Sequence, residues 1–213
     1  MDPGFAYDAT LARTIGRLVY RIADADLPVQ RFGDFAETMG RYLDEVKKLA
    51  DATKEEAATR DRLLASNAYD LAADPTHAQA PPPAFAPSPD FSFAALDTAV
   101  GKLKTSAAAF DSALAAKGAG LSKAQKVKLD ATLRPLTQTL MREEGLPGRP
   151  WFKNVIYAPG LFTGYGAKTL PGVREAIEER RFADAQKYVT ITGGALSAYA
   201  EKLDQATAIL NGA

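Results

Sequence analysis

The sequence predicts an all-α fold, a helical bundle resembling a four-helix bundle, interrupted by one long loop. Apolar residues recur at intervals of three and four along most of the chain, which places them on one face of a helix. No segment alternates apolar and polar residues as a half-buried strand would. Two Ser/Thr-x-x-Glu/Gln sequences, beginning at Thr53 and Ser122, have the spacing of the capping boxes that start helices.

Three amphipathic helices are expected ahead of residue 75. The first ends at Pro28 and has apolar residues at Leu11, Ile15, Leu18, Val19 and Ile22. The second carries an apolar stripe over residues 32–49. The capping-box spacing at residues 53–56 indicates that a third helix begins there, and Asp74-Pro75 would end it.

Residues 75–90 hold six of the 13 prolines of the chain. Proline fixes the backbone angle φ and has no N–H to donate, so this segment can be neither regular helix nor inner strand. We expect an extended, proline-rich connector laid over the surface. A proline-rich ligand for a partner domain is the alternative.

The next helix is expected to begin after Ser92, a suitable N-cap residue, and to bury apolar residues over positions 93–114. Gly118 and Gly120 follow this stripe, and glycine is common directly after the end of a helix. The sequence therefore predicts one helix between Ser92 and Gly118.

Two further helices are expected in the C-terminal half. Ser122 and Gln125 have capping-box spacing and begin a helix that Pro135 should kink. After the long loop, Pro171 suits the first turn of a helix. The last helix carries an apolar stripe over residues 188–210.

The composition excludes several kinds of partner. Lys+Arg and Asp+Glu both number 26, so no excess charge indicates nucleic acid or an anionic membrane. No apolar run approaches the roughly 20 residues that a membrane-spanning helix needs. The chain has no cysteine, which excludes disulfides and thiol chemistry. We therefore expect neither nucleic-acid binding nor a membrane span in this chain.

The usual catalytic motifs are also missing. The single histidine, His77, lies in the connector and is expected to be a solvated loop residue. The sequence has no H-E-x-x-H zinc motif and no G-x-S-x-G nucleophile elbow. Glu143 and Glu144 are adjacent, so they would diverge by about 100° on a helix rather than form an acid/base pair. We expect no catalytic residue, metal site or cofactor here, and no enzyme activity in isolation.

The long loop, residues 146–172, is the most informative segment. Its sequence, LPGRPWFKNVIYAPGLFTGYGAKTLPG, contains four prolines, five glycines and five aromatic residues. A loop so long and apolar is usually functional or closely packed. We expect the rings of Trp151, Phe152 and Tyr157 to pack against the domain. For Tyr165, an anchoring role and a role in a substrate pocket both stay open.

This loop resembles a segment near the C-terminus of the glutamate carboxypeptidase II and transferrin receptor family. The resemblance rests on Arg149-Pro150 followed by two aromatic residues, on Val-Ile-Tyr-Ala-Pro at residues 155–159, and on Pro171-Gly172 opening a helix. Segments elsewhere in the chain resemble the family as well: residues 2–5, 18–28 and 91–103. The matching part of the family is its C-terminal helical domain, known for forming homodimers.

The resemblance implies that residues 1–213 are one transferrin receptor-like dimerisation domain, with residues 75–90 as a connector inside it. It implies two partners, a second copy of the chain and an upstream peptidase domain of the same protein. In the family's peptidases that domain holds two zinc ions, and none of its ligands is present here. The resemblance also favours an exported protein, periplasmic or extracellular.

In those peptidases, the loop after the Tyr-Ala-Pro sequence folds back toward the active site. A Lys-Tyr pair in it helps to bind the terminal glutamate of the substrate. Aligned by the family pattern, Tyr165 falls on the tyrosine and Gly164 on the lysine. Since glycine cannot supply a cation for a carboxylate, this departure puts glutamate selectivity in doubt.

Two neighbours complete the implied site. Thr163 falls where the family has an asparagine, and Lys168 lies close enough in sequence to replace the missing cation. The resemblance therefore implies that residues 157–172 form one wall of a substrate pocket, with Thr163, Gly164, Tyr165 and Lys168 nearest the substrate.

Two functions follow as hypotheses. The first is a homodimerisation domain of a glutamate carboxypeptidase-like zinc peptidase, in which protomers pair through apolar helix faces that include the last helix and the loop region. The alternative is a free-standing helical module that binds a small molecule or a peptide.

Overall fold

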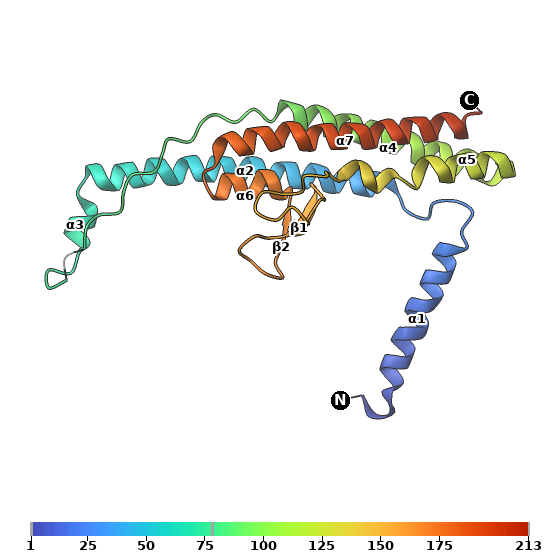
Figure 1. Ribbon diagram of the computed structural model, residues 1–213, viewed down its shortest axis with the longest axis horizontal. Helices are drawn as coiled ribbons and strands as arrows, with labels where there is room; N and C mark the ends of the chain where they lie inside the picture. Colours follow the sequence, from blue (N-terminus) through green and yellow to red (C-terminus); the bar gives the residue numbers. More distant parts are fainter. Residues whose placement is uncertain (1, 78, 213) are drawn as a thin grey trace.

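Three long helices lie side by side along the molecule and form its body: α2 (Phe32–Ala65), α4 (Ala94–Lys117) and α7 (Phe182–Leu210) (Figure 1). The structure, a computed structural model, describes residues 2–77 and 79–212. Two shorter helices, α5 (Lys123–Leu133) and α6 (Pro171–Glu178), pack on α7 toward its opposite ends. The prediction of an all-α helical bundle is confirmed.

The core lies where α7 meets α4 and α2. Its fully buried side chains come from all three helices and include Val46, Leu96, Leu103, Phe110, Val189, Leu196 and Leu203. The rings of Phe32 and Phe110 pack edge to face, with their centres 5.1 Å apart. Burial of each large apolar side chain stabilises the fold by about 1.5–3 kcal/mol.

The last helix contributes much of this core. The apolar stripe of α7 is buried against the other helices of the chain, as Tyr199, Leu203 and Leu210 illustrate. This stripe therefore forms part of the core of the protomer, and the pairing of two protomers through faces that include the last helix and the loop region stays a prediction.

Helix α2 is longer than expected. It continues for 34 residues through Thr53, so the predicted helix start at residues 53–56 is wrong. Thr53 is buried on the same stripe as Ala50 and Ala57, and its Oγ1 donates to the carbonyl of Leu49 at 2.8 Å. The hydroxyl is therefore satisfied within a continuing helix.

The second capping box is confirmed, since Ser122 and Gln125 bond reciprocally at the start of α5.

The remaining helix ends follow the sequence closely. Helix α4 stops directly before Gly118, where a short 3₁₀ turn, η2 (Gly118–Gly120), follows, and α6 begins at Pro171 as predicted. Pro135 separates α5 from a second 3₁₀ turn, η3 (Leu136–Leu140), so it ends α5 rather than kinking it.

Ser92 differs from the prediction, because it does not cap α4, which begins at Ala94. Its backbone N–H and carbonyl instead bond the side-chain amide of Gln186 at 3.0 and 2.9 Å. This contact ties the end of the connector to α7.

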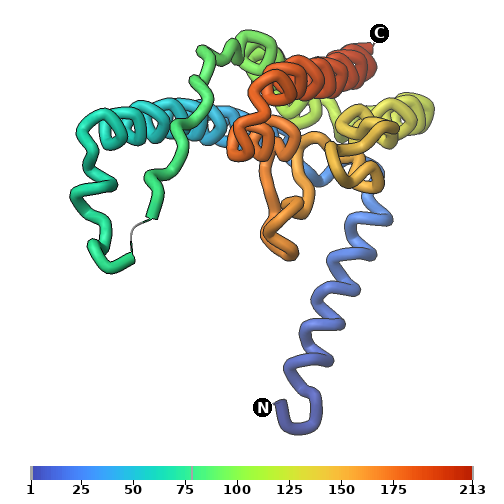
Figure 2. The backbone as a smooth tube through the Cα atoms, turned by 60° about the vertical axis from the view of Figure 1, so that its left-hand side comes forward, coloured from blue at the N-terminus to red at the C-terminus, as the bar shows by residue number. Residues whose placement is uncertain are grey.

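Helix α1 (Ala6–Ala23), preceded by the 3₁₀ turn η1 (Pro3–Phe5), stands away from the body (Figure 1, Figure 2). The predicted helix is confirmed, but its apolar side chains are not packed. Their exposed fractions lie between 49% and 59%: Leu11, Ile15, Leu18, Val19 and Ile22.

After the short helix α3 (Ala68–Ala72) and a turn at residues 75–77, residues 79–90 of the connector form neither helix nor strand and lead back along the body to α4 (Figure 1). Phe85 anchors it, because the guanidinium groups of Arg60 and Arg180 each lie 3.5 Å from the centre of its ring. Lys54 and Asp90 form an ion pair at 2.5 Å near the end of the connector.

The long loop contains a small sheet that the sequence did not predict. Strands β1 (Tyr157–Pro159) and β2 (Ala167–Thr169) pair antiparallel, with Ala158 opposite Lys168. These strands of three residues are too short for alternation to be visible in the sequence. The hairpin projects from the body on the same side as α1 (Figure 1, Figure 2).

Candidate functional site

The loop at the tip of the hairpin, residues 160–166, closes on itself through three hydrogen bonds. The backbone N–H of Gly160 donates to the carbonyl of Gly166 at 2.9 Å. The N–H of Gly166 donates to the carbonyl of Thr163 at 3.0 Å, and Thr163 Oγ1 donates to the carbonyl of Gly166 at 2.8 Å. These bonds within the loop give it a defined shape.

The structure brings three of the four predicted site residues together at this tip. Thr163 closes the turn, Gly164 takes the left-handed conformation at a φ of 57°, and Tyr165 presents a fully exposed ring. The loop could therefore place the Tyr165 hydroxyl against a neighbouring group.

Lys168 lies apart from the tip, on β2. Its Nζ donates to both carboxylate oxygens of Glu178, at 2.8 and 2.9 Å. Glu178 belongs to α6, so the ammonium group is neutralised and held toward the body.

Helix α6 is the platform of the hairpin. Its Glu178 binds Lys168 of β2, and its Arg174 binds Thr169 of the same strand. Arg174 Nε donates to the carbonyl of Thr169 at 3.1 Å, and Nη2 donates to the Thr169 hydroxyl at 2.8 Å. Arg174 also pairs with Glu45 of α2 at 2.5 Å. The second strand is therefore fixed to two helices.

A buried ion pair, Arg149 with Glu175, holds the start of the tip loop near Leu161. Arg149 Nη2 donates to Glu175 Oε2 at 2.8 Å, and the two side chains are only 2% and 8% exposed. The second oxygen, Oε1, accepts the backbone N–H of Leu161 at 2.8 Å. Arg149 Nε and Nη1 have no hydrogen-bond partner within residues 2–77 and 79–212.

Sequence reasoning missed Glu175 and treated Arg149 only as part of a motif. One signal was available, since Glu175 stands between the buried residues Val173 and Ala176 on a short helix. A carboxylate among such neighbours needs a partner, but the sequence does not say which cation supplies it.

The aromatic residues of the long loop are less buried than expected. Phe152 is partly buried against the core, as predicted, but Trp151 is 70% and Tyr157 is 54% exposed. The prediction that these two rings pack against the domain is therefore wrong. With Phe162, which is also exposed, they add to the apolar surface near the hairpin. Large contiguous patches of exposed apolar surface mark contact sites for other proteins or domains, whereas single exposed rings are ordinary.

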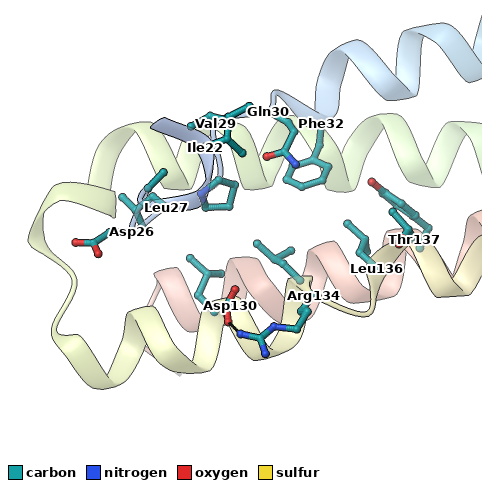
Figure 3. Close-up of a pocket in the computed structure, with 15 residues that line it drawn as sticks. Ile22, Asp26, Leu27, Val29, Gln30, Phe32, Asp130, Arg134, Leu136 and Thr137 are labelled. Atoms are coloured by element: carbon teal, nitrogen blue, oxygen red, sulfur yellow. Dashed lines mark hydrogen bonds and ion pairs between the residues drawn. The ribbon is translucent and has the colours of Figure 1, made fainter. Parts of the chain in front are cut away.

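A second candidate site is a cleft between the segment after α1 and helix α5 (Figure 3). Its volume is about 330 Å³, and its apolar lining includes Leu27, Pro28 and Leu129. Asp130 and Arg134, which form an ion pair, supply its charged wall.

Tyr199 also lines the cleft, and burial raises the pKa of its hydroxyl above the ordinary tyrosine range. A tyrosine hydroxyl is neutral at ordinary pH even without this shift, so Tyr199 adds no charge to the cleft.

The remaining polar candidates form local contacts. His77 is exposed beside Thr76 and Asp74 in the connector. Glu143 pairs with Lys153, and Glu144 pairs with Arg142. A backbone hydrogen bond, followed by the charge of Arg142, lowers the pKa of Glu144. Each of these charges already has a local partner.

Neither a metal cluster nor a membrane helix is found in the described structure. Over residues 2–77 and 79–212, no group of three or more His, Cys, Asp or Glu side chains could hold a metal ion. The helices of that same part of the chain are all too short or too polar to cross a membrane.

A family model described as the transferrin receptor-like dimerisation domain matches residues 91–204, more than half of the chain. The chain belongs to this family. The match runs from the end of the connector through the hairpin to α7.

Two curated relatives are similar to the chain. One is a probable glutamate carboxypeptidase of Arthroderma benhamiae, 25% identical over an alignment of 203 residues that covers 92% of this chain and 22% of the relative. Another is the probable glutamate carboxypeptidase LAMP1 of Arabidopsis thaliana, 37% identical over an alignment of 78 residues that covers 33% of this chain and 11% of the relative. The chain thus spans about a fifth of the first relative's length.

Proposed function

We propose that residues 1–213 form the homodimerisation domain of a longer glutamate carboxypeptidase-like zinc peptidase. The observation that carries this proposal is the family match over residues 91–204, together with alignment to only 22% of a relative named as a probable glutamate carboxypeptidase. The domain itself is not catalytic. Zinc and the hydrolytic groups would belong to an upstream domain, and by the same resemblance the protein would be exported.

The exposed surfaces support an upstream domain as the second partner. In both views α1 and the hairpin project from the same side of the body (Figure 1, Figure 2). The apolar stripe of α1 and the exposed rings near the hairpin would leave water if one domain covered this side. A domain placed there would also meet the Tyr165 tip.

We propose that residues 157–172 then form one wall of the substrate pocket. The exposed ring of Tyr165 supports this role, because its hydroxyl is free to meet a substrate carboxylate. Gly164 offers no cation, and the ammonium group of Lys168 is paired with Glu178. The substrate preference would therefore be less selective for a terminal glutamate than in the family's peptidases.

Self-association is tested by the molar mass of the 213-residue chain in solution, measured by light scattering over a series of concentrations. A mass rising toward twice 22.7 kDa is the expected result. The proposal fails if the chain stays monomeric at high concentration and a longer protein lacking this domain still dimerises. A two-fold interface uses the same patch on both copies, so substitutions of one patch would abolish it.

A binding module is the second candidate function, and the cleft in Figure 3 is the observation that favours it. Its apolar lining and its volume of about 330 Å³ would admit a small apolar molecule. A fluorescent apolar probe such as anilinonaphthalene sulfonate tests this role. Saturable binding to the native chain, lost in Leu129→Lys but kept in Val127→Lys, would favour it over dimerisation alone.

A further inference from the structure

We propose that Arg149 and Glu175 are positioning residues that lock the tip loop, residues 160–166, in one orientation toward the substrate. This inference rests on the proposed function, because it assigns the lock to the pocket wall that carries Tyr165. Glu175 is the central group. One of its oxygens binds Arg149 and the other binds the N–H of Leu161, where the loop begins.

The geometry assigns one glutamate of α6 to each end of the loop. Glu175 holds its start through the backbone at Leu161, and Glu178 holds Lys168, two residues after its end. Glu175 and Glu178 are three positions apart, so they lie on one face of the helix. With both ends fixed to one rigid element, the tip has little freedom to turn.

Stability alone does not account for the buried pair. Removing two charges from water costs much of what their attraction returns, and an apolar pair of similar volume is often equally stable. The cost is raised here by Arg149 Nε and Nη1, which find no acceptor in the described structure. What an apolar pair could not supply is the acceptor for Leu161, and that acceptor fixes the loop.

The lock can be separated from the fold by two matched double variants. The first, Arg149→Met with Glu175→Leu, removes both charges and the acceptor for Leu161, and is called the acceptor-free variant. The second, Arg149→Met with Glu175→Gln, removes both charges but keeps a side-chain oxygen that can accept the N–H of Leu161, and is called the acceptor-retaining variant. The two variants differ in the acceptor and share the loss of the ion pair, so an effect of charge or folding would appear in both.

The first readout is hydrogen exchange at the Leu161 amide in the 213-residue chain. We expect exchange to accelerate roughly tenfold in the acceptor-free variant, the effect of losing about one hydrogen bond, and to stay near wild type in the acceptor-retaining variant. Equal exchange in both variants overturns the lock. A third variant, Lys102→Met with Glu201→Leu, removes an ion pair between α4 and α7 and should leave Leu161 unchanged.

The second readout is peptidase kinetics of the longer protein on a dipeptide with a C-terminal glutamate. A misplaced loop weakens binding of substrate and transition state alike, so KM should rise roughly five- to tenfold in the acceptor-free variant with kcat kept. The acceptor-retaining variant should keep both constants. If exchange accelerates but KM does not change, the link to substrate is overturned. If the wild-type protein cleaves no peptide, the proposed function fails, and exchange at Leu161 still decides the lock.

Discussion

Gly172 lies directly against the ring of Tyr188. A Cβ atom built on Gly172 would stand 2.1 Å from Tyr188 Cδ1, far inside any contact distance. Gly172 is the second residue of α6, and Tyr188 is buried on α7 and donates its hydroxyl to the carbonyl of Gly145 at 3.3 Å. This contact sets how closely α6, which supports the hairpin, approaches α7.

The first prediction is that Gly172→Ala destabilises the chain. The added methyl group must displace a buried ring, and overpacking of this kind costs about 1–3 kcal/mol. Urea unfolding followed by circular dichroism measures the loss.

Gly194→Ala is the matched control for Gly172. It lies in α7 with no atom within 4 Å of a new Cβ, so alanine should stabilise the helix by about 1 kcal/mol. Equal effects at Gly172 and Gly194 would show that helix propensity, not the contact with Tyr188, decides the outcome.

The second prediction concerns the clamp on the connector. Phe85→Ala removes the ring held between Arg60 and Arg180, so the connector should leave the surface more often. Limited proteolysis should then cut within residues 75–90 several-fold faster, with little change in the unfolding midpoint of the helices. Phe162→Ala alters an exposed ring outside the connector and serves as the control. Unchanged cutting in Phe85→Ala would mean that other contacts hold the segment.

The third prediction follows from the ion pair of Lys54 and Asp90, which ties the connector to α2. The hydrogen bond from Lys54, followed by its charge, lowers the pKa of Asp90 from 3.8, and the same pair raises the pKa of Lys54 from 10.5. Because the folded carboxyl has the lower pKa, its contribution is complete above 3.8 and is lost as pH falls through the lowered value.

For Lys54 the sign is reversed: its contribution is complete below 10.5 and is lost as pH rises through the raised value. Protease cutting of the connector should therefore be slow between these limits and faster outside them. Asp90→Asn should abolish the acid limb of this dependence while leaving the bundle folded. A carboxyl titration of Asp90 at or above 3.8, measured by NMR, would contradict the assignment.

The helices of the body could be predicted from the sequence because burial imposes the helical period on their residues. Gly118 and Pro171 also marked helix ends correctly, since the backbone conformations that each allows are local properties. Thr53 was misread because a threonine hydroxyl can bond either to the start of a helix or to the carbonyl four residues earlier. Only packing of Thr53 on the buried stripe chooses between them.

The site was less predictable than the fold. Arg149 and Glu175 are 26 positions apart, and no local rule pairs them. Tyr165 and Lys168 were placed by family resemblance, which did not reveal that Glu178 binds Lys168. Whether a ring such as Trp151 packs or stays exposed depends on which surfaces the rest of the chain covers.

The fourth prediction tests the exposed stripe of α1. Leu18→Asn should change the free energy of unfolding of the 213-residue chain by no more than about 0.5 kcal/mol, because the side chain is 57% exposed and packs on nothing in the body. In the longer protein, where we propose that an upstream domain covers this side, the same change should cost about 2 kcal/mol or more, since it would place an amide in an apolar interface. Arg17→Asn, at the adjacent position on the opposite side of the stripe, is the control and should be neutral in both proteins. Thermal unfolding of both substitutions in both proteins measures the difference in stability. An equal, small effect of Leu18→Asn in both proteins would mean that the stripe of α1 stays in water and that the upstream domain docks elsewhere.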